Sequence, residues 1–325
     1  AVKLWSPEFP NLYNITIKLY EKHTNITTIK TFQNSINNKL HQFRLFENAF
    51  GVHNHQKLDE IESYIGFRSI SLCGSSIKQI CLNNEKYFML GVLDQGYWPD
   101  GLYRSPTDSA LKYDIVKMKS LGFNTIRKHM KIESSRWYYW CDVLGMLVWQ
   151  DMPASDSYYG YEVELSEDER LRVIRDSILN TNNIELDYPH LNLSINGTIM
   201  KSVQEQEQEQ ERPVFLPNTV NGHQKGDQRS LESKLQFEYE LKSMIDTLYN
   251  HPSIVVWVLF NEEWGQYDTL RLGVWLKYYS GQSRLINAVS GWQDRSVGDI
   301  RDVHDYTSQI ELPLVNTYDR TSRAL

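Results

Sequence analysis

The chain has 325 residues, of which 41% are hydrophobic and 12% aromatic, so it can bury a substantial core and is long enough for two domains. Its formal net charge of −7 and the lack of a basic cluster with interleaved aromatic residues argue against nucleic acid as a partner. No apolar stretch reaches the roughly 18 residues of a membrane span, so we expect no membrane partner.

The first residues already have the character of a strand and include no signal peptide, so we expect the natural amino terminus to lie upstream of residue 1. Asn-X-Ser/Thr sequons begin at Asn14, Asn25, Asn192 and Asn196 and leave secretion open. The sequence therefore indicates neither a compartment nor an oligomeric state.

The amino-terminal part is predicted to be β-structure. Residues 12–29 alternate apolar and polar side chains around a polar turn, which predicts an antiparallel hairpin, and a second strand pair is predicted at 64–70 and 77–82. The stretch 33–56 is rich in Asn, Gln and His and has weak periodicity, so we predict an expanded loop there.

The chain has three cysteines, Cys73, Cys81 and Cys141. They have no close metal-ligand spacing and cannot all pair with one another. We predict that they are reduced, buried thiols.

After Asn84 strands alternate with helices, which predicts a parallel sheet. The predicted strands are 88–94, 125–129 and 147–151, and the predicted helices are 109–121, capped by Thr107 and ended by Gly122, and 134–144. Each strand ends in polar residues, namely Asp94, then Arg127 with His129, then Gln150 with Asp151.

Residues 155–232 interrupt this alternation with an acidic, polar stretch that contains the Gln/Glu run 204–211. We predict a solvated, largely disordered insertion with a short helix near 168–179. Beyond it we predict helices at 235–249 and 269–279 and strands at 254–260, 285–290 and 302–306. With about six strands, the sheet corresponds to an eight-stranded α/β barrel that is incomplete.

The strand at 254–260 is the most informative element. It is apolar throughout, as expected of a strand buried on both faces, and it stops at Asn261 and Glu262. A Glu after an arbitrary strand is usually a solvated loop residue, but Asn261 adds a neutral hydrogen-bonding group and Trp264 a flat apolar surface suited to a sugar ring. Charged residues at the carboxyl end of barrel strands are usually chemical, so Glu262 is the candidate catalytic acid, and Glu263 is given a structural role.

Six segments, in order, resemble glycoside hydrolase family 2, which includes β-galactosidases, β-glucuronidases and β-mannosidases. The resembling segments are Leu4–Tyr13, Gly66–Arg68, Leu121–Arg127, Trp137–Pro153, Phe260–Asp268 and Gly298–Tyr306. The resemblance implies a partial immunoglobulin-like β-sandwich domain at 1–84 with a polar insertion, and an incomplete TIM (β/α)8 barrel at 85–325 with the low-complexity insertion at about 155–232.

The resemblance also implies a carbohydrate substrate and no cofactor. The expected reaction is hydrolysis of the O-glycosidic bond of a terminal β-linked sugar by double displacement, with Glu262 as general acid/base and Asn261 as donor to the sugar 2-hydroxyl. Arg127 and His129 match positions that line the sugar pocket, where a buried ion pair is the alternative. The other substrate-binding candidates are Asp151, Trp292, His304 and Tyr306. Asp151 either binds sugar or braces Arg127, and Trp292 is either a platform for the sugar ring or part of the core. His304 and Tyr306 either position the nucleophile or contact sugar hydroxyls.

The nucleophile is a separate question. The resemblance places it in a Gly-Glu-Phe-Gly-like segment shortly after a motif that matches Asp319–Ala324, and the sequence reads no further than Leu325. We therefore expect this chain to lack the nucleophile and to be inactive alone, and Glu311 is a poor substitute. The alternatives are a fragment of a working enzyme or a non-catalytic carbohydrate-binding pseudoenzyme. A metal-dependent hydrolase is disfavoured, because His23, His41, His53 and His55 form no recognisable ligand set.

Overall fold

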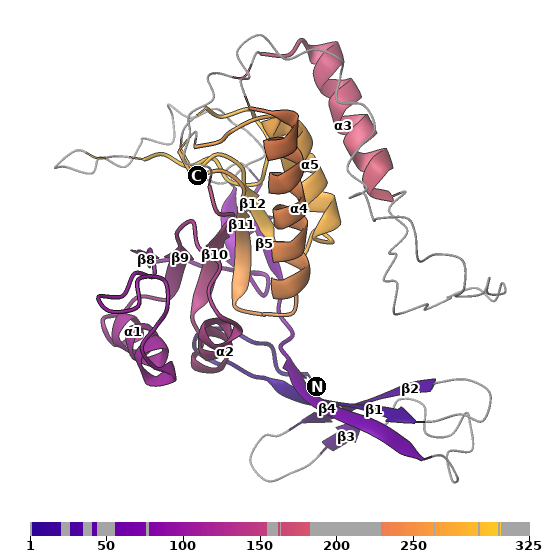
Figure 1. Cartoon of the computed structure of the whole chain (residues 1–325), viewed down its shortest axis with the longest axis vertical. Coiled ribbons are helices and arrows are strands. Elements are labelled where there is room, and N and C mark those ends of the chain that lie inside the picture. The colour runs from indigo at the N-terminus through magenta and orange to yellow at the C-terminus, as the bar shows by residue number, and fades with distance from the viewer. Residues whose placement is uncertain are drawn as a thin grey trace. The chain divides into compact units, whose positions relative to one another are not determined.

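The computed structural model (Figure 1) describes residues 2–20, 27–34, 41–43, 56–75, 78–154, 162, 164–182, 229–262, 264–291, 293–304 and 306. The described residues form two compact units. The first comprises 2–153 and 248–257, and the second comprises the described residues of 154–247 and 258–306. No described helix is both long and apolar enough to cross a membrane.

The first unit begins with a sheet of four strands, β1 (Tyr13–Tyr20), β2 (Thr27–Asn34), β3 (His41–Phe43) and β4 (Lys57–Ile65), in the order β3-β2-β1-β4 (Figure 1). All three pairings are antiparallel, which confirms the predicted hairpin. The prediction of a loop at 33–56 is wrong at two places, because β2 continues to Asn34 and residues 41–43 form β3, which pairs with β2. The strand predicted at 64–70 is also misplaced, because residues 57–65 pair with β1 instead. Most of β4 is exposed, so backbone pairing holds it in place without an apolar alternation in the sequence.

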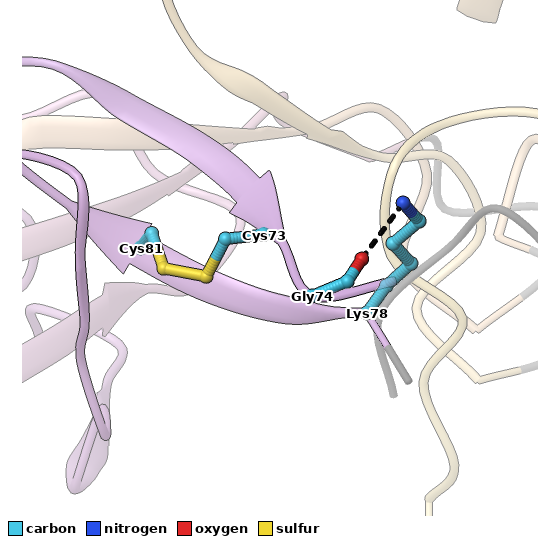
Figure 2. The surroundings of a disulfide bond; sticks show 4 residues. All are labelled: Cys73, Gly74, Lys78 and Cys81. Carbon is cyan, nitrogen blue, oxygen red and sulfur yellow. Dashed lines mark hydrogen bonds between the residues drawn. A yellow bond between two sulfur atoms is a disulfide. The ribbon is translucent and has the colours of Figure 1, made fainter. Parts of the chain in front are cut away.

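A second antiparallel sheet contains β5 (Ile70–Cys73), β6 (Gln79–Leu82) and β7 (Glu85–Lys86). Figure 2 shows that Cys73 and Cys81 form a disulfide across the β5–β6 hairpin, with 6.0 Å between their Cα atoms. The prediction of reduced thiols is therefore wrong for these two residues, because the antiparallel pairing of β5 with β6 brings them within disulfide reach. Cys141 is a free, buried thiol as predicted, and burial raises its pKa above the usual range.

The parallel sheet of the first unit has the order β11-β10-β9-β8. It contains β8 (Gly91–Asp94), β9 (Thr125–Lys128), β10 (Leu147–Asp151) and β11 (Ile254–Val258), and β9 runs parallel to both β8 and β10. Helices α1 (Asp108–Ser120) and α2 (Ser135–Leu144) connect the strands, which confirms the predicted alternation.

Helix α1 begins as predicted, because the Thr107 hydroxyl accepts a hydrogen bond from the Ala110 amide at 3.1 Å. Leu111 and Ile115 form its buried face. Leu121, the last residue of the predicted helix, lies at the C-cap and is 58% exposed.

The second unit contains α3 (Glu167–Asn182), α4 (Leu231–Leu248), α5 (Thr269–Tyr279) and β12 (Leu285–Asn287). The chain that leaves β11 pairs here with β12, since the Leu259 amide donates to the Asn287 carbonyl at 2.9 Å and the Phe260 amide to the Ala288 carbonyl at 3.2 Å. The strand predicted at 302–306 is wrong: its described residues form no strand, and a single parallel bridge joins Asn287 to Ile300. Side-chain contacts, described below, hold this segment instead.

The predicted insertion is also folded at its beginning. Leu165, Val173 and Ile174 pack against a buried cluster that contains Leu270, Ala288, Val289 and Val297. Glu162 accepts a hydrogen bond from the Thr269 amide at 3.2 Å at the start of α5. The helix predicted near 168–179 is thus confirmed as α3, but the prediction of a solvated segment is wrong for these residues. The Gln/Glu run at 204–211 lies outside the described residues.

Candidate active site

Glu262 follows a fully buried stretch of chain. Residues 254–260 are at most 1% exposed, as predicted for a strand covered on both faces. The Trp264 amide donates to the Asn261 carbonyl at 2.9 Å, so the strand ends in a tight turn, and Glu262 has a φ of +47°. A left-handed backbone is uncommon outside glycine and often marks a functional site. Asn261 is buried and Trp264 is 44% exposed, while Glu263 lies outside the described residues.

The Glu262 carboxyl group is held on one side only. Its Oε1 atom lies 2.5 Å from Nδ1 of His304 and accepts a hydrogen bond from the Tyr306 hydroxyl. The side chains of Glu262 and His304 are 22% and 18% exposed. Within the described part of the chain, no hydrogen bond reaches Oε2 of Glu262. One carboxyl oxygen is therefore anchored, while the other is available to exchange a proton with a bound molecule.

A second set of contacts fixes the His304 ring. Its Nε2 atom lies 3.1 Å from the Ser290 hydroxyl and 3.8 Å from Oδ2 of Asp302. Asn287 connects these two residues, since its Nδ2 donates to Asp302 at 2.9 Å and its Oδ1 accepts from the Ser290 amide at 3.0 Å. A Cβ atom added at Gly291 would lie 2.6 Å from the imidazole, so the ring rests directly on glycine backbone.

Sequence reasoning missed Asn287, Ser290 and Asp302. Asp302 could have been found, because it lies two residues before His304 in the resembling segment 298–306. Asn287 and Ser290 gave no separate signal, since short polar residues at the end of a strand are common in loops.

The loop after Glu262 is held by residues that sequence reasoning also missed. The guanidinium group of Arg229 is buried, donates to the Gly265 carbonyl at 2.6 Å and lies 4.7 Å from the ring centres of Phe237 and Tyr267. The Gln266 side chain donates to the Gln293 carbonyl at 2.9 Å. Arg229 escaped notice because it falls inside the predicted insertion.

In the first unit, Arg127 and Asp151 form a two-pronged ion pair. Nε of Arg127 donates to Oδ1 of Asp151 at 2.9 Å, and Nη2 donates to Oδ2 at 2.9 Å. The Met130 amide also donates a hydrogen bond to Oδ2 at 3.2 Å. Burial raises the pKa of Asp151, although Arg127 and His129 oppose the rise. Of the two alternatives for Asp151, the contact that braces Arg127 is present.

The neighbouring strand ends carry a buried network of charges. Lys128, which is 1% exposed, lies 2.9 Å from Asp94 and 3.1 Å from Glu133, and Lys131 lies 2.6 Å from Glu133. His129 is anchored through its amide, which donates to the Asp94 carbonyl at 2.9 Å, and its ring lies 3.4 Å from the Gln95 side chain. The two lysines and Glu133 were not foreseen, although they surround the predicted end of the second strand.

The predicted site residues thus form two groups. Asn261, Glu262, His304 and Tyr306 belong to the second unit, and Arg127, His129 and Asp151 belong to the first. Trp292 and Glu311 lie outside the described residues. In the portion of the chain that the structure describes, no group of three or more His, Cys, Asp or Glu side chains could hold a metal ion.

Comparison with solved structures finds similar folds of low sequence identity. A GH2 β-galacturonidase from Eisenbergiella tayi bound to galacturonate is 20% identical with a TM-score of 0.50, and the match covers 92% of this chain and 36% of that one. A β-glycosidase from Bacteroides vulgatus is 18% identical with a TM-score of 0.48, covering 91% and 26%. A β-glucuronidase from Bacteroides uniformis is 18% identical with a TM-score of 0.47, covering 92% and 26%. This chain therefore spans between 26% and 36% of the length of these proteins.

No curated protein matches the chain. A family model does: residues 76–322 match glycosyl hydrolases family 2, TIM barrel domain. This range contains the βα alternation, the Glu262 turn and the His304 segment. The chain belongs to glycosyl hydrolase family 2, through the TIM barrel domain of that family.

Proposed function

We propose that the chain carries the acid/base residue of a retaining β-glycosidase that hydrolyses the O-glycosidic bond of a terminal β-linked sugar. The observation that carries the proposal is the state of the Glu262 carboxyl group, with Oε1 anchored by His304 and Tyr306 and Oε2 open. A general acid needs a fixed orientation and one oxygen within reach of the reacting group, and this arrangement supplies both.

In the proposed reaction Glu262 acts twice. It first gives its proton to the glycosidic oxygen as the bond to the sugar breaks, and it then takes a proton from the water that releases the sugar. Double displacement also needs a nucleophilic carboxylate about 5–5.5 Å from the acid/base. That residue is not assigned to any described position.

We assign the remaining candidates to substrate binding. The buried Asn261 precedes Glu262 and is the proposed donor to the sugar 2-hydroxyl. Tyr306 is exposed and offers a hydroxyl and an aromatic ring beside Glu262, and Trp292 is the proposed sugar platform. Arg127 and His129, with Asp151 bracing Arg127, are proposed to line the sugar pocket.

The domain division is part of the proposal. Residues 1–84 are assigned to an immunoglobulin-like sandwich, which is supported by their antiparallel sheets. Residues 85–325 are assigned to the barrel domain, which is supported by parallel strands that alternate with helices.

The test compares the hydrolysis of substrates with poor and with good leaving groups by the natural protein that contains these residues. We expect Glu262→Gln to lower kcat/KM by about 10²- to 10⁴-fold on aryl β-glycosides with poor leaving groups, which need a proton. The loss should be much smaller on dinitrophenyl glycosides, which leave without one. Galactosides, glucuronides, mannosides and glucosides should be screened first to find the sugar.

The matched control is Glu240→Gln, the same substitution on the exposed face of α4, which should leave all rates unchanged. Equal losses on both classes of leaving group in Glu262→Gln would contradict an acid/base role. Sugar binding without hydrolysis of any aryl glycoside would instead favour a non-catalytic carbohydrate-binding protein.

A further inference from the structure

His304 contacts acceptors through both ring nitrogens. Nδ1 lies 2.5 Å from the Glu262 carboxylate, and Nε2 lies 3.1 Å from the Ser290 hydroxyl with Asp302 behind it at 3.8 Å. A carboxylate only accepts, so the Nδ1 atom must carry a hydrogen when Glu262 is ionised. Nε2 can then either accept from Ser290 in a neutral ring or donate toward Ser290 and Asp302 in an imidazolium. The site satisfies the ring in both protonation states.

The ring lies between two carboxyl groups. Glu262 lies at Nδ1 and Asp302 at Nε2, and among the described residues the other titratable side chain in contact with the ring is the Tyr306 phenol. The cation next along the chain, Arg301, lies 3.7 Å from Asp294. Both ring nitrogens therefore face carboxylate oxygens, which hold the orientation of the ring toward Glu262.

The ring is also fixed in place before any substrate binds. Gly291 packs against it with no room for a Cβ atom, and the Tyr306 ring meets it edge to face at 6.2 Å between centroids. Asn287 ties Ser290 and Asp302 together. Groups that are already oriented need no reorganisation when charge develops.

We propose that His304 is a positioning residue that, held by Asp302 and Ser290, orients Glu262 and donates a hydrogen bond from Nδ1 to the carboxylate that remains after Glu262 has protonated the leaving group. The inference rests on the proposed acid/base role of Glu262. In the first step the Glu262 O–H bond breaks and the proton joins the glycosidic oxygen, which leaves with the bonding electron pair as the nucleophilic carboxylate of the double displacement bonds to the anomeric carbon. The negative charge left on Glu262 accepts the hydrogen bond from Nδ1 of His304, and no proton of His304 is transferred in this step. His304 therefore acts through Glu262 rather than on the substrate.

The pH profile tests this role. His304→Gln replaces a ring N–H that Asp302 and Ser290 hold toward Glu262 with a flexible amide, so the Glu262 carboxylate loses its oriented donor and Glu262 holds its proton to higher pH. We expect the alkaline limb of the kcat/KM profile to move up by about one pH unit, and the rate on poor leaving groups to fall on the order of 10-fold. Asp302→Asn should move the limb less and in the same direction, because it loosens the His304 ring without removing its Nδ1 donor.

A purely structural role would lower the rate at every pH and leave the limb in place, and that result would overturn the proposal. The two proposals fail in different ways. If Glu262→Gln shows the leaving-group signature and His304→Gln does not move the limb, only the role of His304 is wrong. If Glu262→Gln lacks that signature, the proposed function itself is wrong.

A spectroscopic test does not depend on turnover. In the protein labelled with ¹⁵N-histidine, a proton held between His304 Nδ1 and the Glu262 carboxylate should give a strongly downfield resonance. It should move strongly upfield in Glu262→Gln, whose neutral amide is a weaker acceptor, it should disappear in His304→Gln, and it should persist in Glu240→Gln. Its absence from the folded wild-type protein would refute the proposed contact even if every variant at His304 failed to fold.

Discussion

Two acidic residues end buried strands in this chain, and their surroundings differ sharply. Both oxygens of Asp151 accept hydrogen bonds, from Arg127 and from the Met130 amide, and the side chain is 0% exposed. Glu262 uses one oxygen, and its side chain is 22% exposed. Similar sequence signals therefore led to a closed ion pair in one unit and to an open carboxyl group in the other.

The partners explain what each carboxyl group can do. An arginine side chain stays charged at all ordinary pH values, so the Arg127–Asp151 pair has no proton to share. His304 and Tyr306 both contact the same oxygen of Glu262, so the other oxygen has no hydrogen-bond partner among the described residues. An acid at a strand end is thus a candidate for proton transfer only where its hydrogen-bonding capacity is incompletely used.

Removing the arginine of the Arg127–Asp151 ion pair should give the largest loss of stability. Arg127→Met leaves Asp151 buried without its cation, and we expect the free energy of unfolding at pH 7 to fall by about 3–5 kcal/mol. Because burial already raises the pKa of Asp151, losing Arg127 raises it further. A carboxyl group whose pKa is higher in the folded than in the unfolded state stabilises the fold at low pH, and this stability is lost as the pH rises through the folded-state pKa. The loss of unfolding free energy in Arg127→Met should therefore be smaller at pH 4 than at pH 7.

Urea unfolding at both pH values measures this effect. Arg136→Met is the matched control, because Arg136 and Asp108 form the same two-pronged contact, at 2.9 and 3.0 Å, on the exposed surface. That variant should unfold almost as the wild type does. Equal losses in the two variants would mean that burial does not distinguish the pairs.

The glycine under His304 should give the next largest effect. Gly291 has a φ of +84°, and a Cβ atom there would collide with the imidazole at 2.6 Å. Gly291→Ala strains the backbone and displaces the His304 ring, so we expect the free energy of unfolding to fall by about 2–4 kcal/mol. The downfield resonance of His304 should also be lost. Gly122→Ala is the control, because Gly122 has a φ of +94° and open space around it, so only strain of about 1–2 kcal/mol applies. Identical losses and an unchanged resonance would show that the His304 ring can move without cost.

The sequence predicted the elements whose stability is local or whose burial is continuous. Helix α5 and strand β10 match their predicted ranges, and the apolar run at 254–260 is buried throughout. Elements held by distant partners were missed. Strand β4 is mostly exposed and depends on pairing with β1, and the Cys73–Cys81 disulfide depends on a hairpin turn that cysteine spacing does not reveal.

The candidate site shows the same division. Glu262, His304 and Tyr306 were chosen from the sequence, and the structure brings them into contact. Their immediate supports, Asn287 and Ser290, could not be chosen, because their importance comes from the position of the His304 ring rather than from their own residue types. The segment 302–306 was predicted as a strand from its pattern, yet side-chain contacts rather than backbone pairing hold its described residues.

The open carboxyl group should give the smallest change in stability. In Glu262→Gln the side-chain carbonyl can still accept from Tyr306 and His304, and the new amide group replaces an oxygen that no described residue contacts. The substitution therefore removes a partly solvated charge but no buried partner, and the free energy of unfolding should change by less than about 0.5 kcal/mol. Urea unfolding of this variant beside Arg127→Met tests the contrast directly. A loss of unfolding free energy as large as that of Arg127→Met would mean that Glu262 belongs to a structural ion pair. That result would contradict the proposed role, because a residue that is available for proton transfer cannot also be a principal support of the fold around it.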